Sequence, residues 1–292
     1  MSADAVHASH HVLSETSRWL TAWDAVLWVA LATGAAMYAV GVCTLWRRAG
    51  AGQGVTLWQA VAFVVGWLAL VGALLSPLDA LSDVLFAAHM TQHELIMLVA
   101  APLLVVARPA AAVLWALPQA QRRTIQAWRS PGVLRWWQRA TAPVVVLVLH
   151  GLVVWIWHLP RLFEAALQSE AVHALQHLMF FWTASLFWWA LVHGRYGTLG
   201  YGVSVAFVFA TAVHSSLLGA LLTFAPAPWY PTYQATAPAA GVDALADQQL
   251  AGLLMWVPAG VLLMLAGLAL FAAWLGALER RAVLHSTTRC SR

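Results

Sequence analysis

Charged residues are scarce in this sequence. They make up 9% of its 292 residues, whereas hydrophobic residues make up 62%. Because soluble domains carry roughly 25% charged residues, this composition excludes an ordinary soluble protein and places the chain in a lipid bilayer. Long polar stretches are also missing, so no separate soluble domain is expected.

Cysteine is nearly absent. The chain has two, Cys43 in an apolar stretch and Cys290 near the C-terminus. Such usage excludes both a disulfide framework and a cysteine-based metal motif. Any bound metal must therefore be held by other ligands.

The N-terminus lacks the basic start and the early apolar run of a cleavable signal peptide. We therefore expect the first apolar segment to be retained as a membrane span. Three nearby histidines, His7, His10 and His11, can collect metal ions weakly, but we expect this segment to be disordered.

The sequence contains no lysine, and its fifteen basic residues are all arginine. Basic residues near helix ends favour the cytoplasmic side of a membrane. Only Arg18 and Arg161 fall on the opposite side from the other thirteen, so we expect the N-terminus outside and the C-terminus in the cytoplasm. The net charge of +4 follows from this topology and requires no nucleic-acid partner.

Long apolar runs are what the sequence has instead. A transmembrane helix needs about 20 apolar residues. Windows of this kind, the fourth being the shortest, lie at 24–46, 57–75, 87–107, 143–158, 172–192, 200–224 and 250–275. We therefore predict an all-α membrane protein, a seven-transmembrane-helix bundle in a single domain at 24–275, with an outer segment at 1–23 and a cytoplasmic tail at 276–292.

Three connecting segments have their own character. The segment 76–88 is expected to form a short surface helix leading into the third span. The inner loop 108–141 mixes arginine with tryptophan, which suits a segment lying on the anionic inner leaflet. In the outer loop 225–246, four prolines are expected to exclude regular helix, and aromatic residues such as Tyr230 and Tyr233 suit the headgroup region.

Histidine is the chemically distinctive residue of the predicted spans. Seven of the twelve histidines lie in or beside spans and toward their outer halves: His89, His93, His150, His158, His173, His177 and His214. Ionisable groups are costly inside a membrane, so they usually face the bundle interior and mark a functional site.

Two pairs of these histidines have a spacing of four residues. In a helix this spacing places His89 with His93, and His173 with His177, on one face about one turn apart. His158 ends the fourth span on the same side of the membrane. We therefore predict that these five residues lie at similar depth near the outer mouth of the bundle, where they can bind a metal.

Other residues are expected to support this site. Imidazole binds copper, zinc and haem iron, and thioethers favour Cu(I), so Met90 and Met97 are candidate partners, although methionine equally fills gaps in packing. Asp247 and Gln248, at the outer end of the last span, are expected to orient imidazoles.

His150 and His214 lie deeper than the paired histidines, about 12–15 Å below the outer ends of their spans at 1.5 Å per residue. They can extend a polar path inward. A role as interhelical hydrogen-bond partners explains them equally well.

Several motifs resemble those of the CtaG family, multi-span membrane proteins associated with assembly of caa-type cytochrome c oxidase. The resembling stretches are HMTQH at 89–93, HLP at 158–160, VHALQH at 172–177, FWW at 187–189, WY at 229–230, DQQLAG at 247–252 and MWVP at 255–258. They cover about 76–258 and are specific in combination. The family pattern of a doubled proline after the first histidine pair is reduced here to Ala101 and Pro102.

The resemblance implies a protein of the bacterial cytoplasmic membrane that helps to mature the oxidase, by delivering copper to its binuclear centre. Its implied partners are cytochrome c oxidase subunits and periplasmic copper chaperones.

Three functions remain open from the sequence. The first is an assembly factor, not an enzyme, whose five predicted histidines bind Cu(I) transiently at the outer face. The second is a haem-binding membrane oxidoreductase, because histidines facing each other from two helices also hold haem; haem alone does not explain both pairs. The third is a copper or proton transporter that uses His150 and His214, but the inner halves of the spans with the histidine pairs are mostly apolar.

Overall fold

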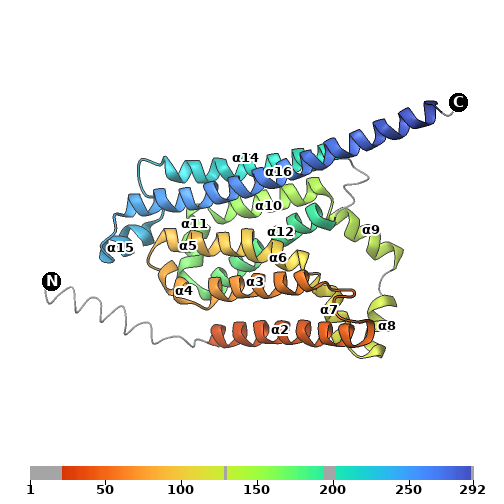
Figure 1. Ribbon diagram of the computed structural model, residues 1–292. Helices are drawn as coiled ribbons and strands as arrows, with labels where there is room; N and C mark the ends of the chain where they lie inside the picture. The colour runs from red at the N-terminus through yellow and green to blue at the C-terminus, as the bar shows by residue number, and fades with distance from the viewer. Residues whose placement is uncertain (1–21, 128–129, 194–200, 291–292) are drawn as a thin grey trace.

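The computed structural model describes residues 22–127, 130–193 and 201–290, and these residues form helices joined by short turns (Figure 1). Within them no strand occurs. The N-terminal histidines His7, His10 and His11 lie outside the described residues, so the prediction about them stays a prediction.

Six helical units in the described part of the chain are long and apolar enough to cross a membrane. They are α2 (Ala22–Ala49), α3 (Leu57–Leu74), the continuous unit of α5 (Phe86–Glu94), η1 (Leu95–Ala100) and α6 (Ala101–Val106), then α12 (Glu170–His193), α14 (Tyr201–Thr223) and α16 (Ala244–Cys290). The predicted all-helical membrane bundle is confirmed, with six crossings or seven.

The seventh crossing depends on a bent pair, α9 (Pro131–Ala140) and α10 (Pro143–Trp157), which meet at 55°. With 15 residues, α10 alone is about 22 Å long at 1.5 Å per residue, which is short for a hydrocarbon core of about 30 Å. Pro143 starts the helix in its first turn, where a missing backbone N–H costs nothing.

The surface of the bundle is apolar. Val29, Leu68, Val144, Phe209 and Phe224 are each more than 60% exposed. Large apolar surface of this kind is rare on soluble proteins. On a membrane-spanning bundle it is expected, because the outer faces of the helices contact lipid tails.

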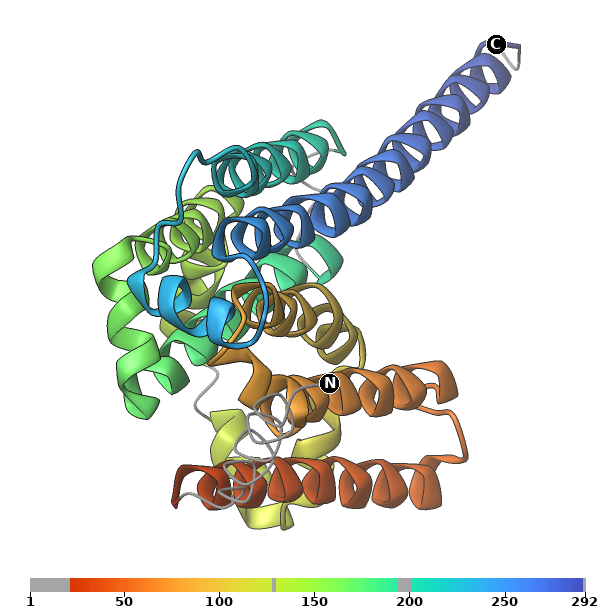
Figure 2. The ribbon, with the colours of Figure 1, turned by 90° about the vertical axis from the view of Figure 1, so that its left-hand side faces the viewer.

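The interior forms two packed cores, one on each side of the third span. The first joins α2 and α3 to α7 (Pro109–Ala116), with the rings of Tyr38 and Phe63 stacked at 3.6 Å. The second joins α5 to α10, α12, α14 and α16. Figure 2 shows α2 and α3 on one side of the molecule and α14 and α16 on the other.

The third span contains a wide turn. Its middle section η1 is a π-helix, and it ends where Pro102 enters the next turn. Proline lacks a backbone N–H and its ring crowds the carbonyl four residues earlier, so a local widening of the helix before it relieves that contact. The Trp188 indole Nε1 donates to the backbone carbonyl of Met97 in this section at 3.0 Å.

Helices α14 and α16 pack closely through two glycines. A Cβ on Gly252 would lie 2.5 Å from the Thr223 hydroxyl oxygen, and a Cβ on Gly219 would lie 2.6 Å from the Trp256 Cβ. Small residues allow membrane helices to approach at such distances.

Three short helices gather at the end of the bundle where α5 begins, on the left of Figure 1. They are α4 (Pro77–Ser82), α11 (Pro160–Gln168) and α15 (Pro231–Ala239), called the cap helices below. The short helix predicted before the third span is present as α4, whose first turn is capped by the Ser76 hydroxyl oxygen, which accepts from the Leu78 N–H at 3.1 Å.

The prediction that prolines exclude helix from 225–246 is wrong. Pro231 occupies the first turn of α15, where its fixed backbone angle suits a helix, and Pro238 comes only at the far end of the helix. Tyr230 and Tyr233 are also buried, at 1% and 3% exposure, rather than placed among lipid headgroups.

The predicted inner loop 108–141 is mostly helical, with α7 followed by α8 (Gln119–Ala127) and α9. The Arg122 guanidinium lies over the Trp115 ring at 4.7 Å. The last span begins earlier than predicted, and α16 continues as one helix to Cys290, so the backbone shows no break where the tail was expected to begin.

Candidate metal centre

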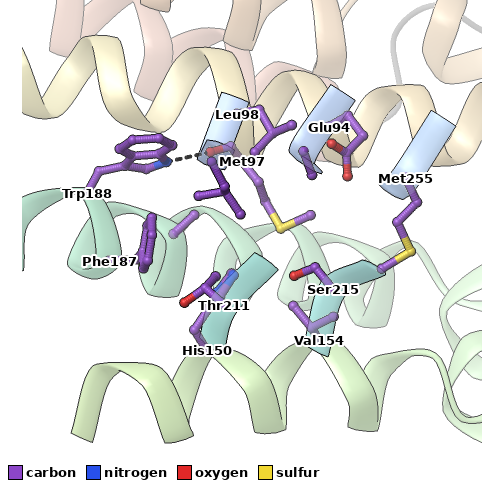
Figure 3. Close-up of a pocket in the computed structure, with 13 residues that line it drawn as sticks. Glu94, Met97, Leu98, His150, Val154, Phe187, Trp188, Thr211, Ser215 and Met255 are labelled. Carbon is purple, nitrogen blue, oxygen red and sulfur yellow. Dashed lines mark hydrogen bonds between the residues drawn. The ribbon is translucent and has the colours of Figure 1, made fainter. Parts of the chain in front are cut away.

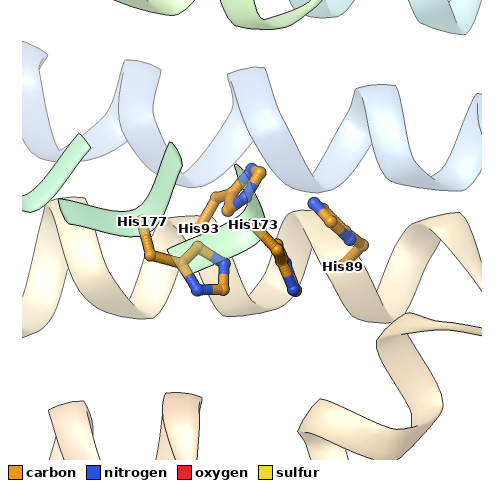
Figure 4. A group of neighbouring side chains, drawn as sticks. All are labelled: His89, His93, His173 and His177. Atoms are coloured by element: carbon orange, nitrogen blue, oxygen red, sulfur yellow. The ribbon is translucent and has the colours of Figure 1, made fainter. Parts of the chain in front are cut away.

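Four of the five histidines predicted as metal ligands converge between α5 and α12. One ring nitrogen from each of His89, His93, His173 and His177 lies within 4.8 Å of the others. These four residues are called the histidine cluster below, and Figure 4 shows their rings turned toward one another.

The two helices supply the cluster as two matched pairs. Within each helix the ring centres are 4.4 Å apart for His89 and His93, and 4.2 Å apart for His173 and His177. Between the helices, His89 lies 5.0 Å from His173 and His93 lies 5.2 Å from His177. The spacing of four residues therefore places both pairs as the sequence predicted.

The cluster is enclosed rather than open. His89, His93 and His177 are 0%, 1% and 7% exposed, and only His173 is partly exposed. Both ring nitrogens of His93, and Nε2 of His173 and His177, are buried without a hydrogen-bond partner among the described residues. The His89 ring faces the Ser82 backbone and the Gln176 side chain. Each such unpartnered atom costs about 1–3 kcal/mol, and a bound metal ion would remove that cost at one nitrogen of each imidazole that it contacts.

His158 lies beside the cluster without joining the set of four. Its ring centre is 6.4 Å from that of His93. Its Nδ1 lies 2.7 Å from the Val154 carbonyl oxygen, so Nδ1 carries the proton and Nε2 keeps a free lone pair. That Nε2 is buried without a hydrogen-bond partner among the described residues, so His158 has a free lone pair beside the cluster.

Aromatic rings form the walls around the histidines. The Phe163 ring lies 4.9 Å from His89, and the Phe180 ring lies 4.6 Å from His93. Both phenylalanines are fully buried. Such walls exclude water and fix the imidazole rings in place.

Asp247 supports the site through the backbone rather than through an imidazole. Its two carboxylate oxygens accept from the N–H groups of Phe86 at 2.7 Å and Ala87 at 3.1 Å. These are the first residues of α5, whose N-terminal N–H groups otherwise lack partners, and a negative charge there also complements the helix dipole. The carboxylate thus anchors the helix turn that carries His89.

Gln248 holds the loop over the cluster. Its side-chain oxygen accepts from the Trp229 backbone N–H at 2.6 Å. The sequence placed it beside an imidazole, whereas the structure places it against this loop.

The cap helices close the site by hydrogen bonds. The Tyr233 hydroxyl donates to the Ser82 carbonyl at 2.6 Å, and the Tyr230 hydroxyl donates to the His158 carbonyl at 2.9 Å. Burial raises the pKa of both tyrosines above the ordinary value, so both phenols stay protonated and remain donors at neutral pH.

A carboxylate ties two cap helices together. Glu164 on α11 accepts from the Thr232 backbone N–H at 3.1 Å and from the Thr232 hydroxyl at 2.6 Å on α15. Sequence reasoning missed Glu164, Tyr230 and Tyr233 as parts of the site, because their partners lie more than 60 residues away in the chain. The aromatic pair in the outer loop was the one available signal, and it was read as interfacial.

The remaining predicted residues lie below the cluster or in the packing around it. Met90 is 1% exposed and belongs to the apolar core. The rings of His150 and His214 are 6.0 Å apart. His150 and Met97 line a separate small cavity.

A profile of the family described as cytochrome c oxidase caa3 assembly factor (Caa3_CtaG) matches residues 36–277. The chain belongs to this family. The family match confirms the resemblance seen in the sequence motifs and extends it over the second half of α2 and the whole of α3. No curated protein and no solved structure shows significant similarity to the chain.

The residues present fit a metal ion with nitrogen ligands. A tetrahedral set with metal–nitrogen bonds of about 2.0 Å has ligand atoms about 3.3 Å apart, so nitrogens within 4.8 Å need only small side-chain rotations to close around an ion. This member of an oxidase assembly-factor family thus brings four imidazoles close enough together to converge on one ion.

Proposed function

We propose that the protein assists assembly of a caa3-type cytochrome c oxidase by binding Cu(I) in the histidine cluster and passing it to the oxidase. The observation that carries this proposal is the set of four enclosed imidazoles with unpaired nitrogens in a member of an assembly-factor family. Copper is here a cargo, so the role requires no catalytic turnover.

The charge of the site favours Cu(I) over a divalent ion. All four cluster residues are histidines, which bind metal ions as neutral imidazoles, and the nearby Asp247 carboxylate is engaged by backbone N–H groups. An ion in this low-dielectric space therefore keeps its full charge, and the desolvation penalty rises steeply with that charge. Imidazole is also an established ligand for copper.

The histidine cluster suits transient binding. His173 is the partly exposed member of the cluster, so an ion enters or leaves past it. His158, with its free Nε2, offers a next ligand while the ion moves. A cargo site needs such access, whereas a permanent structural site is closed by its ligands.

Orientation and partners follow from the same proposal. The arginine distribution supports an orientation with the histidine cluster toward the outer side of the bacterial cytoplasmic membrane, where copper chaperones can reach it and oxidase subunits can receive the metal. A reporter enzyme active only outside the cytoplasm, fused after Arg292, stays inactive in this orientation and becomes active if the orientation is reversed.

A haem protein is the alternative, because α5 and α12 face each other with histidines. The spacing disfavours it: neighbouring rings of the cluster are 4.2 to 5.2 Å apart, so a macrocycle enters only if the two helices separate. A transporter would need a polar route onward from His150 and His214.

Metal content and optical spectrum of the detergent-purified protein distinguish these functions. They are measured as isolated and after anaerobic loading with Cu(I), for the wild type and for a variant with all four cluster histidines changed to Ala. His193→Ala is the matched control, because His193 lies at the other end of α12 and stacks on Trp189 at 4.5 Å.

We expect nitrogen-bound copper in the wild type and in the control, and at least one copper fewer per chain in the fourfold variant. A Soret band would identify a haem protein instead. Protein that stays free of copper after loading would overturn the copper-binding proposal.

A further inference from the structure

A small cavity of about 30 Å³ lies deeper in the bundle than the histidine cluster, among α5, η1, α10, α12, α14 and α16. A cavity of this size holds one or two water-sized species. Figure 3 shows its lining, with the side chains of Glu94, Met97 and Met255 turned toward the same space.

Glu94 brings a carboxylate into this apolar region. Its Oε2 is fully enclosed and has no hydrogen-bond partner among the described residues. Glu94 as a whole is partly exposed, but an enclosed carboxylate oxygen without a partner is costly, and such groups in proteins are protonated, are paired or bind metal ions. The arrangement therefore calls for a cation or a proton at this position.

The other polar groups on the wall are soft or neutral ligands. Met97 and Met255 contribute two thioether sulfurs, and both residues are buried, at 7% and 3% exposure. Thioethers select Cu(I) among biological metal ions. Leu98, Val154 and Phe187 supply apolar surface, and Thr211 and Ser215 add two hydroxyl groups to the wall.

His150 adds one imidazole, and its hydrogen bond to Thr183 decides which ring nitrogen carries the proton. The Thr183 hydroxyl donates to the Met179 carbonyl at 2.8 Å, so it accepts from His150 Nδ1 at 3.1 Å. The proton therefore sits on Nδ1 and the Nε2 lone pair is free to bind an ion. This is the usual way in which a protein fixes the ligating tautomer of a histidine.

We propose that this cavity is a second Cu(I) site, with Glu94, Met97, Met255 and His150 as its ligands. The single negative charge of Glu94 neutralises a monovalent ion, whereas a divalent ion would keep a net charge in the membrane interior. The charge balance favours a monovalent ion, and among monovalent ions the two thioethers select Cu(I). The inference adds a deeper storage position to the proposed copper-binding function.

The two sites are adjacent along one helix. His93 of the cluster immediately precedes Glu94 in the chain, and the π-helical section begins at Leu95. One turn of the third span therefore contributes a ligand to each site, on different faces. Copper bound in the cavity is held by a charged, sulfur-containing set that the cluster lacks.

The test counts copper and identifies its ligands in the detergent-purified full chain loaded anaerobically with Cu(I). Copper per chain is measured together with copper X-ray absorption, which separates sulfur from nitrogen ligands. The variants are Met97→Leu with Met255→Leu, which conserves volume, and the fourfold histidine-to-Ala variant. Met264→Leu is the control, because Met264 lies on the same helix α16 but is 57% exposed.

We expect two Cu(I) per wild-type chain with both sulfur and nitrogen ligands, and the same for the Met264→Leu control. The double Met variant should keep one Cu(I) without sulfur ligands, and the fourfold histidine variant should keep one with sulfur ligands. Glu94→Gln should weaken the sulfur-containing site at least tenfold.

One Cu(I) per wild-type chain, with nitrogen ligands only, would overturn the second site and leave the proposed function standing. One Cu(I) with sulfur ligands, unchanged in the fourfold histidine variant, would support the second site and contradict copper binding by the cluster. A double Met variant that binds as much copper as the wild type, with the same ligands, would also overturn the second site.

Discussion

The buried nitrogens of the histidine cluster lower the stability of the metal-free protein, although they are the atoms available to bind a metal. A polar atom that is removed from water and left unpaired costs about 1–3 kcal/mol, and both nitrogens of His93 are in this position. In the metal-free protein these atoms therefore carry an energetic cost, which a bound ion would reduce.

Replacing His93 by Leu should consequently stabilise the metal-free protein, by about 1–2 kcal/mol on this reasoning, while weakening Cu(I) binding. Thermal unfolding in detergent, with and without Cu(I), measures both effects. Cu(I) should raise the wild-type melting temperature, as any ligand of the native state does, and should affect the variant much less. A variant less stable than the metal-free wild type would show that the imidazole has a structural partner.

Asp247 should matter through helix α5 rather than through direct contact with metal. Asp247→Ala removes both acceptors for the Phe86 and Ala87 N–H groups, and loss of a helix cap costs about 0.5–2 kcal/mol. We expect a lower melting temperature and weaker Cu(I) binding. Asp247→Asn keeps one acceptor, so it should lie between the wild type and the Ala variant; if both variants bind Cu(I) as the wild type does, the cap does not position His89.

The sequence predicted the histidine pairs because helical periodicity is local, and a spacing of four residues places two side chains on one face. The role of Asp247 was not predictable in the same way. Its partner Phe86 lies 161 residues away, and a carboxylate near a helix end is compatible with either an imidazole or a backbone partner. His158 shows the same limit, because its depth was correct but its side-chain direction depends on the Val154 carbonyl.

At the scale of elements, the contact between α14 and α16 depends on glycine. Gly252→Ala places a Cβ against Thr223, and overpacking of this kind costs about 1–3 kcal/mol. Gly260→Ala on the same helix is the control, because the nearest atom to its Cβ would be 4.0 Å away. In thermal unfolding we expect a lower melting temperature for Gly252→Ala than for Gly260→Ala. Equal melting temperatures would mean that α14 and α16 can move apart with no loss of stability.

The tie between α11 and α15 should control the rate at which copper exchanges. Glu164→Ala removes both hydrogen bonds to Thr232 and loosens the cap helices, whereas the copper ligands are untouched. We expect faster transfer of Cu(I) to an external chelator at unchanged stoichiometry, followed by stopped-flow spectroscopy. Glu170→Ala, at an exposed acid of the same end, should leave the rate unchanged; a Glu164 variant with wild-type rates would exclude the cap helices as a barrier.

Elements differed in how well they could be predicted. Long apolar spans were recognisable from hydropathy alone, since lipid imposes the same length on each. The helix α15 was missed, because proline counts suggested a loop, whereas position within the helix decides whether proline is tolerated. The bend between α9 and α10 was missed because a hydropathy window does not report helix direction.

On the scale of the whole molecule, the fold separates an apolar, lipid-facing surface from a polar interior at one end. The cap helices, the histidine cluster and the cavity lie in sequence from that end inward. This order suits a protein that takes up an ion from one side of the membrane and releases it to a partner on the same side. Membership of the caa3 assembly-factor family indicates that the partner is an oxidase. The ligands of the histidine cluster indicate copper as the candidate cargo.

The most direct measurement is the copper content per haem of the caa3-type oxidase, purified from cells that produce it together with this chain. Cells carry the wild type, the fourfold histidine-to-Ala variant or His193→Ala, each at equal abundance in the membrane. We predict copper-replete oxidase with the wild type and with His193→Ala, and copper-depleted oxidase with the fourfold variant. Copper-replete oxidase in cells carrying only the fourfold variant would contradict the role of the histidine cluster in oxidase assembly.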